Sequence, residues 1–263
     1  MDPQSPPLAA ADQPPAGALA LAGSGEYTPA MRATDAALLA TLGPGPARVV
    51  VCPLAAGREA PASPARWARM GVEHFTALGA QVDAAMILNR EDAADPQWLP
   101  LLNAADFYYF SGGDPGHAAA SLRDTPAWEV ILRRHRAGAV LGGCSAGAMM
   151  LGGWMFTPPG RGQRGFQPGL GLLPHLITLP HFDQFGRWVT TQFVGWLIRS
   201  APAGTTVAGI DEDTALVRLG LADGAPDAGI WEVQGRQTVT VFDGPAGTHR
   251  VYRAGERVPL PFA

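Results

Sequence analysis

The residues best suited to chemistry lie in the stretch Gly143-Cys144-Ser145-Ala146-Gly147, which matches the pattern G-x-S-x-G. A short apolar run, Ala139 to Leu141, precedes it, and small residues that can begin a helix follow it. This order predicts a nucleophile elbow, in which a strained backbone lifts the serine hydroxyl out of a sheet. The N–H of Ala146 is then the expected oxyanion donor. The same pattern also fits a plain strand-to-helix turn whose serine only caps the helix.

A serine nucleophile needs a base within hydrogen-bond reach, and histidine is the usual one. His181 is the preferred candidate because it follows a short apolar strand and precedes a predicted helix, which places it on the same strand-end rim as Ser145. His117, near the Gly112-Gly113 turn, is the second candidate. His74 and His135 lie in amphipathic helices beside charged residues, so we expect them to be solvated.

Apolar strands alternate with amphipathic helices up to the predicted elbow, which predicts an α/β fold with a mostly parallel sheet. Ligands of such sheets bind beyond the carboxyl ends of the strands, where 23–26, 112–114 and 143–147 would meet. The Pro/Gly-rich stretch 157–171 is predicted to be an active-site loop. Residues 1–16 are predicted to be a disordered tail and 17–263 a single domain. About 205–263 would form an antiparallel β extension of the main sheet.

The net charge of −4 and the lack of a basic run argue against nucleic-acid or membrane partners. No apolar stretch approaches the roughly 20 residues of a membrane span, and the N-terminus lacks a basic leader, so a cytoplasmic protein is expected. Two cysteines do not make a disulfide framework. No ligand spacing suggests a metal, and the glycine pattern at 23–27 is too weak for a nucleotide cofactor, so we expect neither.

Four segments together resemble the peptidase E and cyanophycinase family of serine peptidases: 110–114, 143–148, 180–182 and 209–216, in the family's order. The resemblance implies a glutamine-amidotransferase-like fold, a three-layer α/β/α sandwich. It implies Ser145 as nucleophile, His181 as base and oxyanion donors at Gly113 and Ala146. It also implies a small-peptide substrate of the Asp-X or isoaspartyl kind, and it leaves a homodimer open. The expected substrate-binding residues are Asp114, Arg187 and Glu26.

One departure concerns the acid that orients the histidine, which the resemblance places shortly after the nucleophile. Residues 146–182 contain no Asp or Glu, and Gln163 stands about where the cyanophycinase-type Glu would be. A neutral Gln163 can hold the imidazole but stabilises its cation less, and losing the acid of a comparable triad costs about 10⁴ in turnover. Glu26 and Asp183 are candidate substitutes for this acid.

Three interpretations follow. The first is an active serine peptidase that uses Ser145 and His181. The second is a catalytically weakened or inactive member that binds a ligand or partner, which the missing acid favours. The third is a cysteine enzyme, but Cys144 precedes the turning residue, so its side chain should point into the fold. An α/β-hydrolase is disfavoured, because that fold takes its acid between the serine and the histidine.

Overall fold

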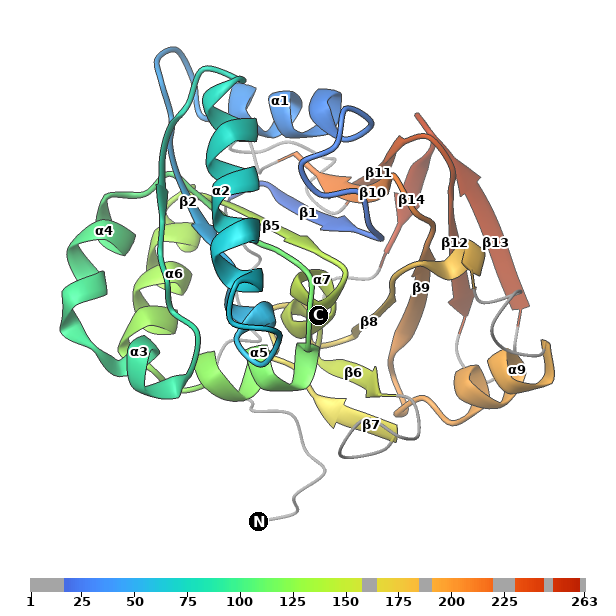
Figure 1. The fold of residues 1–263 in the computed structure, drawn as a ribbon. Coiled ribbons are helices and arrows are strands. Elements are labelled where there is room, and N and C mark those ends of the chain that lie inside the picture. Colours follow the sequence, from blue (N-terminus) through green and yellow to red (C-terminus); the bar gives the residue numbers. More distant parts are fainter. Residues whose placement is uncertain (1–16, 158–164, 185–190, 220–229, 244–247, 261–263) are drawn as a thin grey trace.

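An eight-stranded sheet forms the centre of the computed structural model, which describes residues 17–157, 165–184, 191–219, 230–243 and 248–260 (Figure 1). Its strand order is β14-β11-β10-β1-β5-β4-β2-β3, and the five strands from β1 to β3 in that order are parallel. β10, β11 and β14 continue the sheet in antiparallel fashion. The strands are β1 (Leu19–Ala22), β2 (Arg48–Cys52), β3 (Gln81–Ala84), β4 (Phe107–Phe110), β5 (Val140–Cys144), β10 (Thr214–Arg218), β11 (Ile230–Gly235) and β14 (Arg257–Pro259).

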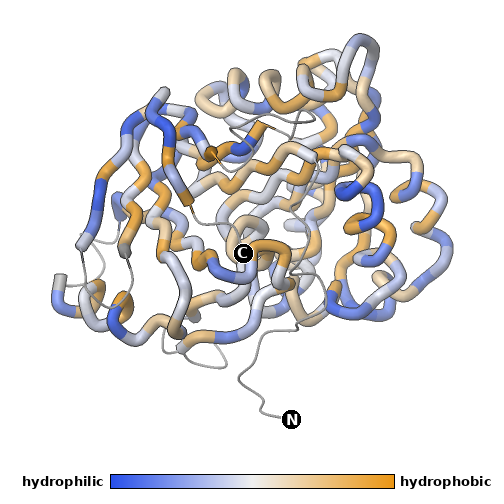
Figure 2. Tube along the Cα trace, turned by 180° about the vertical axis from the view of Figure 1, so that it is seen from behind, coloured by the Kyte–Doolittle hydropathy of each residue, from blue (hydrophilic) through white to orange (hydrophobic). Residues whose placement is uncertain are grey.

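Helices cover both faces of this sheet because its strands are apolar on both sides. Along β4, Tyr108 and Phe110 join the core under α4 to α7, whereas Phe107 and Tyr109 join the core under α1 and α2. The apolar residues follow the strands through the middle of the molecule in Figure 2. The helices are α1 (Arg32–Ala40), α2 (Ser63–Thr76), α3 (Arg90–Ala94), α4 (Leu99–Ala104), α5 (Pro115–Leu122), α6 (Pro126–Arg136) and α7 (Ala146–Leu151), with 3₁₀ turns η2 (Leu54–Ala56) and η3 (Pro96–Trp98). The three-layer α/β/α architecture expected from the sequence is confirmed.

A second sheet of four strands, in the order β13-β12-β9-β8, lies beside the first, on the right of Figure 1. Its strands are β8 (Leu176–Leu179), β9 (Thr206–Ile210), β12 (Thr238–Asp243) and β13 (Thr248–Arg253). α9 (Thr191–Arg199) packs against it through Leu197 and Ile198, which share a core with Ile177, Leu179 and Val207. The hairpin of β6 (Trp154–Thr157) and β7 (Gly165–Pro168) contributes Trp154 and Phe156 to the same core.

Two sequence expectations are therefore corrected. Among the described C-terminal strands, β10, β11 and β14 extend the main sheet, whereas the strands at 206–210, 238–243 and 248–253 belong to the second sheet. The stretch 157–171 is not loop throughout, since it contains β7. An alternating pattern shows that a segment is a strand and which face is apolar, but it does not name the strand's partner.

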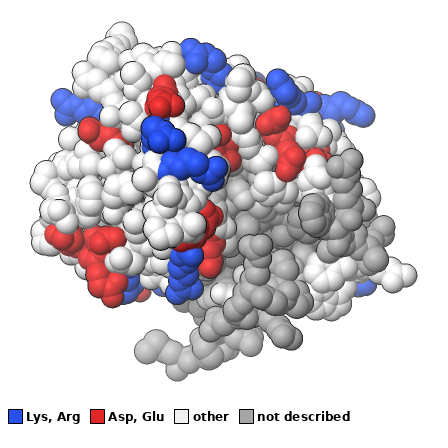
Figure 3. Space-filling view, in the orientation of Figure 1, with Lys and Arg blue, Asp and Glu red and all other residues white. Residues whose placement is uncertain are grey.

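The surface of the described residues carries charges of both signs, which are interspersed on the face shown in Figure 3. Among the described residues, no helix has the length and apolar character needed to cross a membrane.

Candidate functional site

Ser145 stands at the turn between β5 and α7, with backbone angles φ 52° and ψ −113°. Positive φ is unusual for a residue with a side chain and places Ser145 in the strained conformation of an elbow. The turn is held by the Ser145 N–H, which donates to the Ala22 carbonyl at 2.9 Å. Its glycines are required sterically, since a Cβ on Gly143 would lie 2.5 Å from the Gly147 carbonyl oxygen. A Cβ on Gly147 would lie 2.2 Å from the carbonyl oxygen of Phe110.

His181 follows β8 and brings its ring to the elbow. Its Nε2 lies 3.1 Å from the Ser145 Oγ, which is hydrogen-bond distance. Its backbone also has positive φ, 53°, so both residues of the pair are held in uncommon conformations. The two residues that the sequence paired as nucleophile and base are thus neighbours in space, although they come from different sheets.

The third member of this arrangement is Glu212, which the sequence analysis did not select. Its Oε1 lies 2.8 Å from His181 Nδ1. A carboxylate can only accept, so Nδ1 carries the proton and Nε2 is left to accept from the Ser145 hydroxyl. Glu212 belongs to the segment 209–216, one of the four that resemble the peptidase E and cyanophycinase family. That segment was the available signal, but the resemblance placed the acid shortly after the nucleophile, and the substitutes considered were Glu26 and Asp183.

Strand pairing explains why Glu212 reaches His181. β8 and β9 are parallel neighbours with Leu179 opposite Gly209, so the residues that follow the two strands emerge side by side. The chain then crosses from β9 in the second sheet to β10 in the main sheet, and β10 begins beside the end of β1, where Gly23 N–H donates to Thr214 O at 2.9 Å. Glu212 lies on this crossing and is therefore brought toward both His181 and the elbow.

Hydrogen bonds on both sides fix the Glu212 backbone. Asp183 Oδ1 accepts from the Glu212 N–H at 2.9 Å, and the Glu212 carbonyl accepts from Gln237 Nε2 at 2.9 Å. Gln184 Nε2 donates to Glu212 Oε2 at 3.3 Å and to Asp183 Oδ2 at 2.6 Å. Asp183, expected as a substitute acid, therefore contacts the Glu212 backbone, and Glu212 contacts the ring.

The turn after β4 carries the second expected oxyanion donor. Gly113 has φ 141°, and a Cβ there would lie 2.3 Å from the Ala55 carbonyl oxygen, so a glycine is needed. Gly112 lies against the nucleophile, since a Cβ there would be 3.3 Å from Ser145 Cβ and 3.7 Å from its Oγ. Asp114, expected to bind substrate, caps α5 by accepting from the His117 N–H at 2.9 Å.

Glu26 and Cys144 meet beneath the elbow. The Cys144 thiol is fully buried and donates to Glu26 Oε2 at 3.0 Å, so its side chain points into the fold as expected. Burial, together with the negative charge of Glu26, raises the pKa of Cys144 well above its ordinary value. A protonated, inaccessible thiol is a poor nucleophile, which counts against the cysteine interpretation. Glu26 is only 8% exposed, and its other oxygen accepts from the Gly112 N–H at 3.0 Å, so its carboxylate is engaged by the protein itself and not by His181.

The other histidines in the described helices are structural, and the expectation that two of them are solvated is wrong. His74 is buried, with its Nε2 2.8 Å from Asp35 Oδ2. His135 is fully buried, with its Nδ1 2.6 Å from the Ala139 carbonyl, and loss of solvation lowers its pKa to about 4. His117 bonds to the Leu88 carbonyl at 2.7 Å. The helices that carry these residues have a buried face and an exposed face. Charged neighbours in the sequence lie on other faces of the helix, so they do not show whether the histidine ring is exposed.

Gln163 and Arg187, expected as the orienting residue and as a substrate carboxylate clamp, lie outside the described residues.

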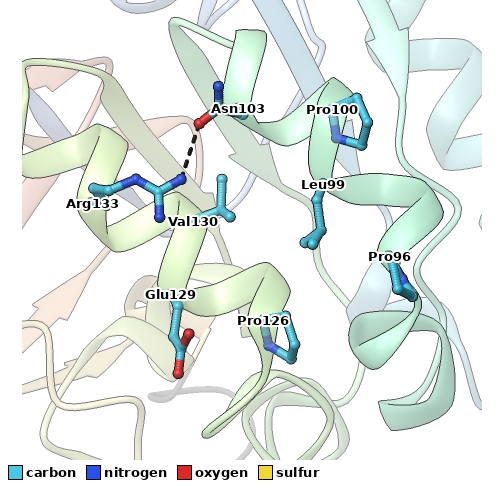
Figure 4. Close-up of a pocket in the computed structure, with 8 residues that line it drawn as sticks. All are labelled: Pro96, Leu99, Pro100, Asn103, Pro126, Glu129, Val130 and Arg133. Carbon is cyan, nitrogen blue, oxygen red and sulfur yellow. Dashed lines mark hydrogen bonds between the residues drawn. The ribbon is translucent and has the colours of Figure 1, made fainter.

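A separate groove lies between α4 and α6, where Leu99 and Pro100 face Pro126 (Figure 4). None of the eight residues that line this groove is a serine, cysteine or histidine, so it offers neither a nucleophile nor an imidazole base.

Comparisons with known proteins point to one family. The family model for "Peptidase family S51" matches residues 19–221. Cyanophycinase from Trichormus variabilis is 32% identical over 185 residues, which is 66% of this chain and 58% of that protein. Cyanophycinase from Synechococcus elongatus is 31% identical over 170 residues, which is 62% of this chain and 49% of that protein. The match thus spans about half to three fifths of these relatives' own length.

A solved structure extends the similarity to most of the fold. The crystal structure of a peptidase from an acI-B1 Actinobacterium aligns with a TM-score of 0.81 at 32% identity and covers 94% of this chain and 98% of that one. The family match includes Ser145, His181 and Glu212, and the structural match covers nearly the whole molecule. The chain belongs to peptidase family S51.

Proposed function

We propose that this chain is a serine peptidase in which Ser145 is the nucleophile, His181 the general base and Glu212 the residue that orients and stabilises the imidazole. The observation that carries the proposal is the continuous contact from Ser145 Oγ to His181 Nε2 at 3.1 Å and from His181 Nδ1 to Glu212 at 2.8 Å. A hydroxyl, an imidazole and a carboxylate in this order are the parts of a hydrolytic triad. The positive φ of Ser145 supports the same assignment, since strain of this kind concentrates at active sites.

The geometry supports an acyl-transfer mechanism. Ser145 Oγ attacks the scissile carbonyl carbon while His181 Nε2 takes the hydroxyl proton. The carbonyl oxygen becomes an oxyanion, for which the N–H groups of Gly113 and Ala146 are the proposed donors. His181 then protonates the leaving amine, and the acyl group remains on Ser145. A water molecule, deprotonated by His181, releases the acid and restores the serine.

Glu212 bears on the choice between an active and a weakened enzyme. The weakened interpretation rested on the lack of an acid between Ser145 and His181 in the sequence. An acid from a later segment, at 2.8 Å from Nδ1, can stabilise the imidazolium formed during attack, and this favours the active peptidase. The proposed substrates are small peptides of the Asp-X or isoaspartyl kind. The support for them is the family resemblance and the relatives described as cyanophycinases.

The test combines a covalent probe with a substrate panel. A fluorophosphonate probe should label the wild type on Ser145, as located by peptide mass spectrometry, and should not label Ser145→Ala. Asp-X, Gly-X and β-Asp-Arg dipeptides would then be assayed for release of the free amine. A wild type that neither reacts with the probe nor cleaves any of these peptides would return the chain to the ligand-binding interpretation.

A further inference from the structure

The turn Ser111–Asp114 has an unusual distribution of hydrogen bonds. The Ser111 N–H donates to the Cys52 carbonyl at 3.4 Å, the Gly112 N–H to Glu26 Oε1 at 3.0 Å and the Asp114 N–H to the Ala55 carbonyl at 2.8 Å. Among the described residues, the N–H of Gly113 has no acceptor. Gly113 is half-buried, so its unpaired N–H can be reached from the solvent side of the turn and is available to a ligand oxygen. Three of the four donors are thus fixed, and the fourth is left for chemistry.

Two of these three acceptors are backbone carbonyls of the segment 52–55, and the third is a side chain. That side chain, Glu26, lies in a turn with positive φ on both sides, 84° at Gly25 and 64° at Tyr27. Tyr27 anchors the turn through ring contacts with Tyr109 and Phe75, whose centroids lie 5.2 and 6.2 Å away. The turn that carries Glu26 is therefore anchored to the aromatic core through Tyr27.

The same carboxylate touches the elbow. Its Oε2 accepts from Cys144, the residue before Ser145, while its Oε1 accepts from Gly112, whose Cα faces Ser145. Glu26 therefore links the elbow strand to the Gly112–Gly113 turn through one side chain, by one hydrogen bond to each. The two proposed oxyanion donors, the N–H groups of Gly113 and Ala146, belong to the turn and to the residue that follows the elbow serine.

We propose that Glu26 is a positioning residue that fixes the Gly112–Gly113 turn relative to the elbow and so directs the Gly113 N–H at the oxyanion formed on Ser145. The inference rests on the proposed serine peptidase function. Its contribution is positional. A carboxylate near an oxyanion repels it, so the charge itself cannot be the benefit. The side chain supplies an acceptor that reaches the Gly112 N–H. Loss of this hydrogen bond would let the turn rotate, and the neighbouring Gly113 N–H would then point away from the oxyanion.

The experiment separates the acceptor from the charge. Glu26→Leu removes both, whereas Glu26→Gln keeps a carbonyl oxygen for the Gly112 N–H and removes the charge. The rate constant for fluorophosphonate labelling of Ser145 would be measured from pH 5 to 9 by intact-protein mass spectrometry. The ³¹P resonance of the adduct would be recorded as well, because the phosphoryl oxygen occupies the oxyanion position.

For Glu26→Leu we expect a rate about 100-fold lower, in line with the loss of one oxyanion donor, and a shifted ³¹P resonance. The pH midpoint should stay unchanged, because His181 and Glu212 are untouched. Glu26→Gln should keep the rate within about tenfold of the wild type. A folded Glu26→Leu protein that reacts within about threefold of the wild type would overturn the inference, as would a Glu26→Gln protein that is as slow as Glu26→Leu.

If Glu26→Leu does not fold, the cysteine variants decide. Cys144→Ala removes the bond to Glu26 Oε2. Cys52→Ala is the matched control, because Cys52 is also a buried thiol but its Sγ donates to the Val50 carbonyl. Cys144→Ala should label several-fold more slowly than Cys52→Ala, and equal rates would refute the positioning role. A wild type that is not labelled at all refutes the proposed function and the inference with it. A labelled wild type with unaffected variants refutes the inference alone.

Discussion

Replacing Glu212 with glutamine tests the triad most directly, because it keeps the shape of the side chain and removes its charge. His181 Nδ1 and Glu212 Oε1 are 2.8 Å apart. Unit charges at that separation attract by about 1.5 kcal/mol in bulk water and by about 6 kcal/mol at an effective dielectric constant of about 20. The side chains of His181 and Glu212 are 41% and 38% exposed, so water screens the pair and the lower half of this range applies.

The expected result is therefore a loss of about 10²-fold in the rate of the chemical step, smaller than the 10⁴ seen for a buried triad acid. The assay is the fluorophosphonate labelling rate, which does not require the natural substrate, followed by kcat and KM on any peptide that the wild type cleaves. The loss should lie in kcat, since Glu212 acts on the imidazolium formed in the transition state. His181→Ala is the reference for complete loss of the base.

Asp183→Asn is the matched control for the surroundings of Glu212. Its side-chain oxygen can still accept from the Glu212 N–H, so its rate should stay within about tenfold of the wild type. If Glu212→Gln reacts as fast as the wild type, the carboxylate does not assist His181, and the assignment of the third triad member is wrong. If Asp183→Asn is the slower of the two, the acid must be assigned to Asp183 instead.

Three further predictions follow from single residues. Ser145→Gly should melt at a higher temperature than Ser145→Ala in calorimetry, because glycine adopts the positive φ at this position without strain. The net gain in the free energy of unfolding should be up to about 1 kcal/mol, and equal melting temperatures would argue against strain. Cys144 should be alkylated slowly by iodoacetamide in the native state, because its thiol is buried and its pKa is raised, and fast labelling with loss of activity would favour the cysteine interpretation. The pKa of His135 falls to about 4 in the folded protein, below its unfolded value of about 6.5, so the unfolded state binds more protons between these values. The contribution of His135 to the free energy of unfolding should be complete above about pH 6.5 and fall by up to about 3 kcal/mol toward pH 4. Denaturant titrations at several pH values should show that His135→Gln loses this dependence on pH. His249→Gln, a control at an exposed position, should keep it.

Local sequence determined the elements that carry the chemistry. The apolar run before Gly143, the small residues after it and the glycines on either side of Ser145 are local requirements of a strand, a turn and a helix, so the elbow could be predicted from residue types alone. The alternation of apolar strands with amphipathic helices likewise predicted the parallel sheet and its two helical layers. Cys144 was expected to point inward because side chains alternate along a strand, and its burial confirms this.

Tertiary structure alone decided which acid meets His181 and which sheet each late strand joins. Glu212 is far from His181 in sequence and becomes its neighbour through the parallel pairing of β8 with β9 and the crossing of the chain to β10. Strand pairing depends on long-range contacts that a periodic pattern does not encode. Glu26 is the same kind of case. Its residue type suggested a substrate or orienting role, but its contacts with Gly112 and Cys144 arise only when the ends of β1, β4 and β5 are brought together at one edge of the sheet.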